Sequence, residues 1–144
     1  MSQFNAALFD LDGTLVDTVS TRIEAWERVF AEFGIPVAHG DLGPMIGMDG
    51  RRLAHAAAEA AGQRLSEERA EEIDRAAGAR FDLHNRQPRP LPGVDTAIAR
   101  LDRAGITWAI ATSSRAEQVI ASLTALDLGH RPRIVDGSRV EHAK

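Results

Sequence analysis

The sequence of 144 residues contains no cysteine, which excludes disulfide bonds and metal sites built on thiolates. No apolar run approaches the roughly 20 residues of a membrane-spanning helix, and no basic segment followed by a long apolar stretch marks a secretory signal. The formal net charge of −4 provides no general basic surface for nucleic acid. We therefore expect a cytoplasmic protein that binds neither membranes nor nucleic acid.

Lysine is almost as scarce as cysteine, because Lys144, the last residue, is the only one in the chain. The five histidines lack the close helical pairing of a zinc motif, so we interpret them as surface or linker residues. The content of 44% hydrophobic and 26% charged residues is ordinary for a globular protein. The length suits one compact domain, or a domain that carries an inserted subdomain.

Hydrophobic periodicity predicts strands that alternate with helices. The strands are expected at 3–9, mostly buried, and at 106–111 and 133–135. Helices are expected at 18–33, 51–61, 66–85, 94–104 and 115–126, with a loop and a short turn at 40–47. Alternate prolines in 88–93 favour an extended linker. The predicted fold class is therefore α/β, with a Rossmann-like parallel sheet core and an inserted all-helical region.

Local patterns predict how two of these helices begin and which side chains they bury. Ser66 is followed by two acids and fits a helix N-cap, while Ser114 and Glu117 fit a Ser-x-x-Glu capping box. The helix at 66–85 carries apolar residues that are available for burial, namely Ile73, Ala77, Phe81 and Leu83.

Two carboxylates follow the first predicted strand, in the sequence Asp-Leu-Asp-Gly-Thr at 10–14. One carboxylate of such a pair can stay ionised as a nucleophile and metal ligand, while the other holds a proton as a general acid. Gly13 lets the backbone turn sharply after the pair. Asp-Gly is also a common turn sequence, but the functional interpretation agrees with the motifs described below.

Residues 10–17, Asp-Leu-Asp-Gly-Thr-Leu-Val-Asp, resemble the first motif of the haloacid dehalogenase superfamily, whose members are mostly magnesium-dependent phosphatases that form an aspartyl-phosphate. The resemblance implies that Asp10 attacks phosphorus and that Asp12 protonates the leaving group and later activates water. It also implies a Mg²⁺ ion bound by the Asp10 carboxylate and the Asp12 main-chain carbonyl. Dehalogenating members generally lack the second Asp, so its presence points to phosphoryl transfer.

Three further segments match this family. Thr112 and Ser113 end the strand at 106–111, and the resemblance implies that the Thr112 hydroxyl and the Ser113 N–H bind the phosphoryl group. Lys144 stands at the spacing of the family lysine that pairs with the nucleophile and the phosphate. Arg51 and Arg52 follow a glycine-containing loop that resembles the cap loop facing the active site, where an arginine could bind a phosphate or carboxylate of the substrate. An alternative for these arginines is an ordinary solvated helix start.

The resemblance implies a sheet core of residues 1–15 and 88–144 around a helical cap at 16–87. The family's fourth motif, an acid or two after a fourth strand, has no counterpart in this sequence. We therefore expect a shortened form of a longer protein, with a weakened magnesium site. The first strand would then be an exposed apolar edge that could support self-association.

The function predicted from these motifs is hydrolysis of a small phosphorylated metabolite, such as phosphoglycolate or a sugar phosphate. One alternative is a sugar phosphomutase of the same superfamily. Arg22 stands where those mutases have a histidine, which argues for hydrolysis. The absence of a cap lysine argues against the Schiff-base chemistry of phosphonate-cleaving relatives. A further alternative is a non-catalytic phosphate-binding module with an incomplete metal site.

Overall fold

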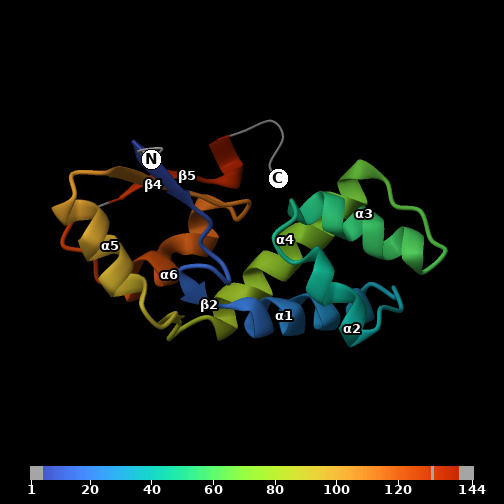
Figure 1. Cartoon of the computed structure of the whole chain (residues 1–144). Helices are drawn as coiled ribbons and strands as arrows, with labels where there is room; N and C mark the ends of the chain where they lie inside the picture. The colour runs from blue at the N-terminus through green and yellow to red at the C-terminus, as the bar shows by residue number, and fades with distance from the viewer. Residues whose placement is uncertain (1–4, 131, 140–144) are drawn as a thin grey trace.

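The sheet in the computed structural model, which describes residues 5–130 and 132–139, has three parallel strands in the order β1–β4–β5 (Figure 1). They are β1 (Ala6–Phe9), β4 (Thr107–Ala111) and β5 (Arg133–Val135). Because the strands run in the same direction, their carboxyl ends meet at one edge of the sheet. The expected α/β fold with a parallel sheet and a helical insert is confirmed.

The prediction that the first strand is mostly buried is wrong. Leu8 in β1 is 70% exposed, whereas Phe9 is partly buried and packs edge-to-face on Trp108, with ring centroids 6.2 Å apart. Successive side chains of a strand point to opposite faces, and the described residues cover only the Phe9 face of β1. β1 pairs with β4 alone, so the expectation of a first strand at an edge is confirmed within the described sheet.

Most of the helices lie between two short strands, β2 (Val16–Asp17) and β3 (Arg89–Pro90). We call residues 18–88, which connect these strands, the helical insert. Its helices are α1 (Val19–Glu32), α2 (His39–Leu42), α3 (Gly50–Ala60) and α4 (Glu67–His84). Residues 40–47, predicted to be a loop with a short turn, contain most of α2 and a 3-10 turn at Gly43–Met45.

Side-chain caps fix the starts of the two long helices that follow this turn. The Asp49 carboxylate accepts a hydrogen bond from the Arg52 N–H at 3.2 Å at the start of α3. The Ser66 hydroxyl accepts one from the Arg69 N–H at 3.2 Å at the start of α4, which confirms the predicted cap. Each cap satisfies a backbone donor that has no partner inside its own helix.

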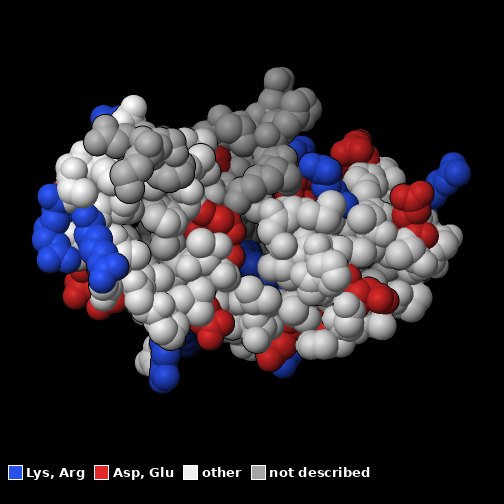
Figure 2. Space-filling view, viewed as in Figure 1, with Lys and Arg blue, Asp and Glu red and all other residues white. Residues whose placement is uncertain are grey.

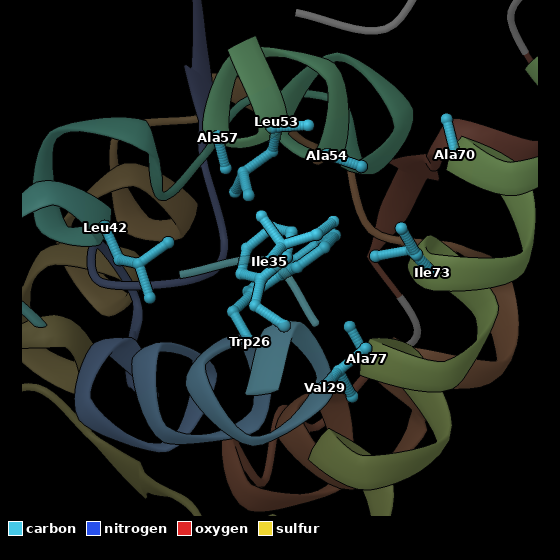
Figure 3. Packing of buried hydrophobic residues seen from close by; sticks show 12 residues of the cluster. Trp26, Val29, Ile35, Leu42, Leu53, Ala54, Ala57, Ala70, Ile73 and Ala77 are labelled. Atoms are coloured by element: carbon cyan, nitrogen blue, oxygen red, sulfur yellow. The ribbon is translucent and has the colours of Figure 1, made fainter. Parts of the chain in front are cut away.

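The insert has its own hydrophobic core between α1, α3 and α4 (Figure 3). Trp26 stacks on Phe30, with ring centroids 5.3 Å apart, and the small alanines on the inner face of α3 allow close packing. Burial of a side chain such as Leu53 is worth about 1.5–3 kcal/mol. Ile73, Ala77 and Phe81 are buried as predicted, but Leu83 is 58% exposed because it lies on the outer side of α4.

A second hydrophobic core joins the sheet to the helices after β3. Helix α5 (Val94–Arg103) packs beside β4, and the Trp108 indole N–H donates to the Asp102 carboxylate at 2.9 Å. The helix predicted at 115–126 begins as a 3-10 segment, Ala116–Val119, and continues as α6 (Ile120–Ala125).

The two connections between the insert and the sheet region lie side by side. β2 and β3 pair antiparallel, with Val16 opposite Pro90 and Asp17 opposite Arg89. The extended path expected from the alternate prolines is therefore confirmed at β3. Nearby, the buried Asn85 amide donates to the Ser122 hydroxyl at 3.2 Å. Within the described ranges, no helix is long and apolar enough to cross a membrane.

Candidate functional site

A pocket lies where the carboxyl ends of β1 and β4 face the helical insert. In the space-filling view, acidic and basic atoms meet in the furrow between the half that carries α5 and the half that carries α3 (Figure 2). The pocket brings together four residues that the sequence singled out, Asp10, Asp12, Thr112 and Ser113. They come from the loops after two neighbouring parallel strands, which is where ligands bind in open α/β sheets.

The loop after β1 turns sharply so that both acids reach the pocket. Gly13 has a φ of +74° and donates its N–H to the Val16 carbonyl at 2.8 Å. A Cβ at Gly13 would lie 2.6 Å from a Val19 methyl carbon. The turn therefore requires glycine for both its backbone angle and the close approach of α1.

The carboxylate of Asp12 is enclosed by three donors from two parts of the chain. Oδ1 accepts from the Thr18 hydroxyl at 2.7 Å, while Oδ2 accepts from the Arg22 guanidinium and the Ser114 hydroxyl, each at 2.8 Å. Only 7% of the Asp12 side chain is exposed. Burial alone would raise the pKa of Asp12, but the charge of Arg22 and the hydrogen bonds of the three donors lower it. This arrangement favours the ionised carboxylate.

Arg22 connects the insert to the sheet region, and the sequence interpretation missed this role. Its Nη2 also lies 2.6 Å from the Ser114 hydroxyl oxygen, and its guanidinium stacks over the Phe81 ring at 3.8 Å from the centroid. Thr18 immediately precedes α1 and Arg22 lies in its first turn, so the two residues, four positions apart, point to the same side near the motif at 10–14. The four-residue spacing of Thr18 and Arg22 was the feature of the sequence that could have indicated that both bind Asp12.

The phosphate-binding pair expected after β4 lies at the pocket with defined contacts. The Thr112 N–H donates to the Val135 carbonyl at 3.0 Å, which ties the loop to β5, and its hydroxyl oxygen accepts from the Ser114 N–H at 3.1 Å. The Ser113 hydroxyl donates to the Gly47 carbonyl of the insert at 3.0 Å. The pair is therefore held between the sheet and the insert.

The capping box predicted from Ser114 is wrong. The Ser114 hydroxyl is used by Asp12 and Arg22, and the N–H of Arg115 is capped by the side-chain oxygen of Gln118 at 2.9 Å. The misassigned serine is instead part of the pocket. A local Ser-x-x-Glu pattern does not reveal a distant carboxylate that competes for the hydroxyl.

The structure does not bring the predicted arginines into this pocket. Arg51 pairs with Asp49 at 3.7 Å and lines a neighbouring cleft. Arg52 lines neither the pocket that contains Asp10 nor this cleft. The Arg52 side chain is exposed, and its N–H donates to the Asp49 carboxylate at the start of α3. Lys144 lies outside the described residues.

A second group of charges bridges the insert and the sheet region at the rim of the pocket. Arg115 donates from Nε and Nη2 to Asp74 Oδ2, at 3.1 and 2.7 Å, and from Nη2 to Glu71 at 2.8 and 3.0 Å. Burial raises the pKa of Asp74, an effect that the Arg115 contacts only partly offset and that Asp49 and Glu71 reinforce. Burial would also raise the pKa of Glu71, but its hydrogen bonds from arginine lower it. Asp74 also lines the pocket itself.

The described residues provide few oxygen ligands for a metal ion. No group of three or more potential side-chain ligands of the His, Cys, Asp or Glu type occurs among them. Both carboxylate oxygens of Asp12 are bonded to protein donors, so its main-chain carbonyl is the oxygen it can offer, beside the Asp10 carboxylate. Mg²⁺ commonly keeps several waters and takes one or two carboxylates plus substrate phosphate, so this donor chemistry fits it.

Comparison with known proteins finds similarity to one family of hydrolases along nearly the whole chain. The model of the haloacid dehalogenase-like hydrolase family matches residues 7–144. A phosphoglycolate phosphatase of Agrobacterium fabrum is 31% identical over 128 residues, which are 85% of this chain and 53% of that protein. An N-acetylmuramic acid 6-phosphate phosphatase of Pseudomonas aeruginosa is 26% identical over 134 residues, which are 92% of this chain and 58% of that protein.

Solved structures agree with the fold described above. A hydrolase from Pseudomonas syringae superimposes with a TM-score of 0.91 at 29% identity, covering 97% of this chain and 64% of that one. The chain spans about half the length of the curated relatives it matches.

Proposed function

The chain belongs to the haloacid dehalogenase-like hydrolases, and from that membership we propose that it is a magnesium-dependent phosphatase acting on a small phosphorylated metabolite. The observation that carries the proposal is the meeting of Asp10, Asp12, Thr112 and Ser113 in one pocket. Relatives that are named as phosphatases support the reaction class.

Asp10 is the proposed nucleophile. Its carboxylate oxygen forms a bond to phosphorus as the ester oxygen leaves, and Asp12 supplies the proton that the leaving alcohol needs. Asp12 then takes a proton from water, which attacks the aspartyl-phosphate, releases phosphate and restores Asp10. The donors around Asp12 lower its pKa, which suits the second step and opposes the first, in which Asp12 must carry the proton that it donates.

The remaining groups stabilise charge on the phosphoryl oxygens. Thr112 contributes its hydroxyl and Ser113 its N–H, from a loop that the Ser114 N–H and the Ser113 hydroxyl hold in place before the substrate arrives. Mg²⁺, held by the Asp10 carboxylate and the Asp12 carbonyl, would neutralise negative charge on the phosphate when bound. Lys144 keeps its predicted role beside the nucleophile as part of this proposal.

The proposed cap is residues 16–87, which contain all but the last residue of the helical insert. Residues 16–87 would close over the substrate and exclude bulk water, with 1–15 and 88–144 forming the core that carries the chemistry. Contacts across the two parts, such as Ser113 with Gly47 and Arg22 with Asp12, support this proposal because they bring the insert against the loops that carry the chemistry.

The test is hydrolysis of an aryl phosphate by the chain, with and without Mg²⁺, beside Asp10→Asn. The matched control is Asp17→Asn, because Asp17 has an exposed side chain in β2 and does not line the pocket. We expect turnover that needs both Mg²⁺ and Asp10 and that survives in the control. Undiminished turnover by Asp10→Asn would refute the mechanism. Release of inorganic phosphate would indicate a phosphatase, whereas a phosphomutase would return the phosphoryl group to the substrate. A folded chain without turnover would favour the non-catalytic alternative.

A further inference from the structure

We propose that Asp74 and Gln118 together bind a hydroxyl group of the leaving alcohol, so that the pocket takes phosphate esters of neutral polyols in preference to those of hydroxy acids. This inference rests on the proposed phosphatase function and specifies its substrate class. Both residues line the pocket that contains Asp10, although one comes from α4 of the insert and the other from the segment after β4.

Each of the two side chains has one polar atom engaged by Arg115 and another left for a ligand. Arg115 donates only to Oδ2 of Asp74, and its main-chain N–H donates to Oε1 of Gln118. Among the described residues, no hydrogen bond reaches Oδ1 of Asp74 or leaves Nε2 of Gln118. Arg115 therefore orients both side chains without using their remaining acceptor and donor.

Two glycines make room for these same atoms. A Cβ at Gly50 would lie 1.8 Å from Oδ1 of Asp74, and a Cβ at Gly78 would lie 2.0 Å from Nε2 of Gln118. Gly78 stands inside the long helix α4, where glycine is unfavourable for the helix itself. A larger residue at Gly50 would displace Oδ1 of Asp74, and a larger residue at Gly78 would displace Nε2 of Gln118.

An acceptor and a donor that line the same pocket match the chemistry of an alcohol. A hydroxyl group donates one hydrogen bond and accepts others, so it can donate to Oδ1 of Asp74 and accept from Nε2 of Gln118. A carboxylate can only accept, and it would meet the like charge of Asp74. The two side chains would therefore distinguish a CH₂OH group from a COO⁻ group of similar size.

The other charges of the pocket act in the same direction. Three acids line it, Asp10, Asp12 and Asp74, whereas Arg22 is the one cationic side chain among the described lining residues. Its Nη2 is shared by Asp12 and Ser114, while its Nε is buried without a hydrogen-bond partner among the described residues. Asp12 already pairs with this cation, so a carboxylate on the leaving group would meet a lining with more acidic than basic side chains.

The experiment compares glycerol 3-phosphate with 3-phosphoglycerate, which differ only in CH₂OH against COO⁻ at one end. We expect kcat/KM for glycerol 3-phosphate to be higher by about tenfold or more, because the acid loses a hydrogen bond and meets a like charge. Asp74→Asn removes the charge and should lower this ratio. Glu71→Gln is the matched control, because it removes the other carboxylate on Arg115 and does not line the pocket, so the ratio should stay at the wild-type value.

The design separates this inference from the proposed function. A ratio of two substrates does not depend on the fraction of folded enzyme, so a poorly folding variant still gives an answer. Dissociation constants of both compounds, measured with Asp10→Asn, report the same preference without turnover. If no ester is hydrolysed, the proposed phosphatase function is refuted, and the ratio of the two dissociation constants still tests this inference. The inference would be overturned if 3-phosphoglycerate had an equal or higher kcat/KM, or bound equally or more tightly, than glycerol 3-phosphate. It would also be overturned if Asp74→Asn did not change the ratio.

Discussion

Replacing Arg22 with glutamine would leave the Asp12 carboxylate buried without the cation that neutralises it. The exposed fractions of the two side chains are 12% for Arg22 and 7% for Asp12, so water cannot easily replace the lost partner. The same change removes the contact with the Ser114 hydroxyl and the stacking of the guanidinium over Phe81.

Removing one partner of a buried ion pair typically costs 3–5 kcal/mol, and a cation–π contact adds to this. Thr18 and Ser114 would still donate to Asp12, so we expect a loss in the free energy of unfolding near the lower end, about 3 kcal/mol. For a chain of this size the melting temperature should fall by about 10 °C.

Urea unfolding followed by tryptophan fluorescence is the assay. Trp26 belongs to the core of the insert and Trp108 to the core beside the sheet, so the two report on different parts of the molecule. Arg75→Gln is the matched control, because that arginine is 66% exposed in its pair with Glu71 and should contribute under about 0.5 kcal/mol. A loss for Arg22→Gln no larger than the control value would refute the reasoning.

Three further predictions follow from contacts described above. Because the pKa of Asp74 is raised and that of Glu71 is lowered, the stability that Asp74 contributes should fall as pH rises above about 4, while that of Glu71 should fall as pH drops below that value. Urea unfolding of Asp74→Asn and Glu71→Gln against wild type should therefore give opposite slopes with pH. Gly78→Ala should not yield the usual helix gain of about 0.5–1 kcal/mol, because the new Cβ would meet Gln118, and adding Gln118→Ala should restore that gain in thermal melts. Ser66→Ala should cost about 1 kcal/mol in the same assay by removing the cap of α4.

Much of the fold could be predicted from the sequence because it depends on local patterns. The apolar spacing of α1 and α4 and the cap at Ser66 follow from residues within a few positions of one another, and the parallel sheet follows from the alternation of strands with helices along the chain. The exposure of Leu8 could not be predicted in the same way, because an apolar run does not specify which faces of a strand have neighbours.

The candidate site could be predicted only where a motif carries it. Asp12 and Ser114 are 102 residues apart, and their contact depends on how the insert returns the chain to the sheet. Arg115 reaches Asp74 across 41 residues for the same reason. Charges that meet over such separations leave no periodic pattern in the sequence, so the ring of donors around Asp12 emerged only from the structure.

The pairing of β2 with β3 has a mechanical consequence. Both passages of the chain between the insert and the sheet run through one narrow ribbon, where Val16 faces Pro90. Two adjacent strands joined by hydrogen bonds resist sliding and separation, so rotation about the line of the ribbon would be the easiest motion of the insert once its contacts with the sheet region, such as Arg22 with Asp12, are released. A small rotation there would become a large displacement at the far end of α3, while atoms near the ribbon would hardly move.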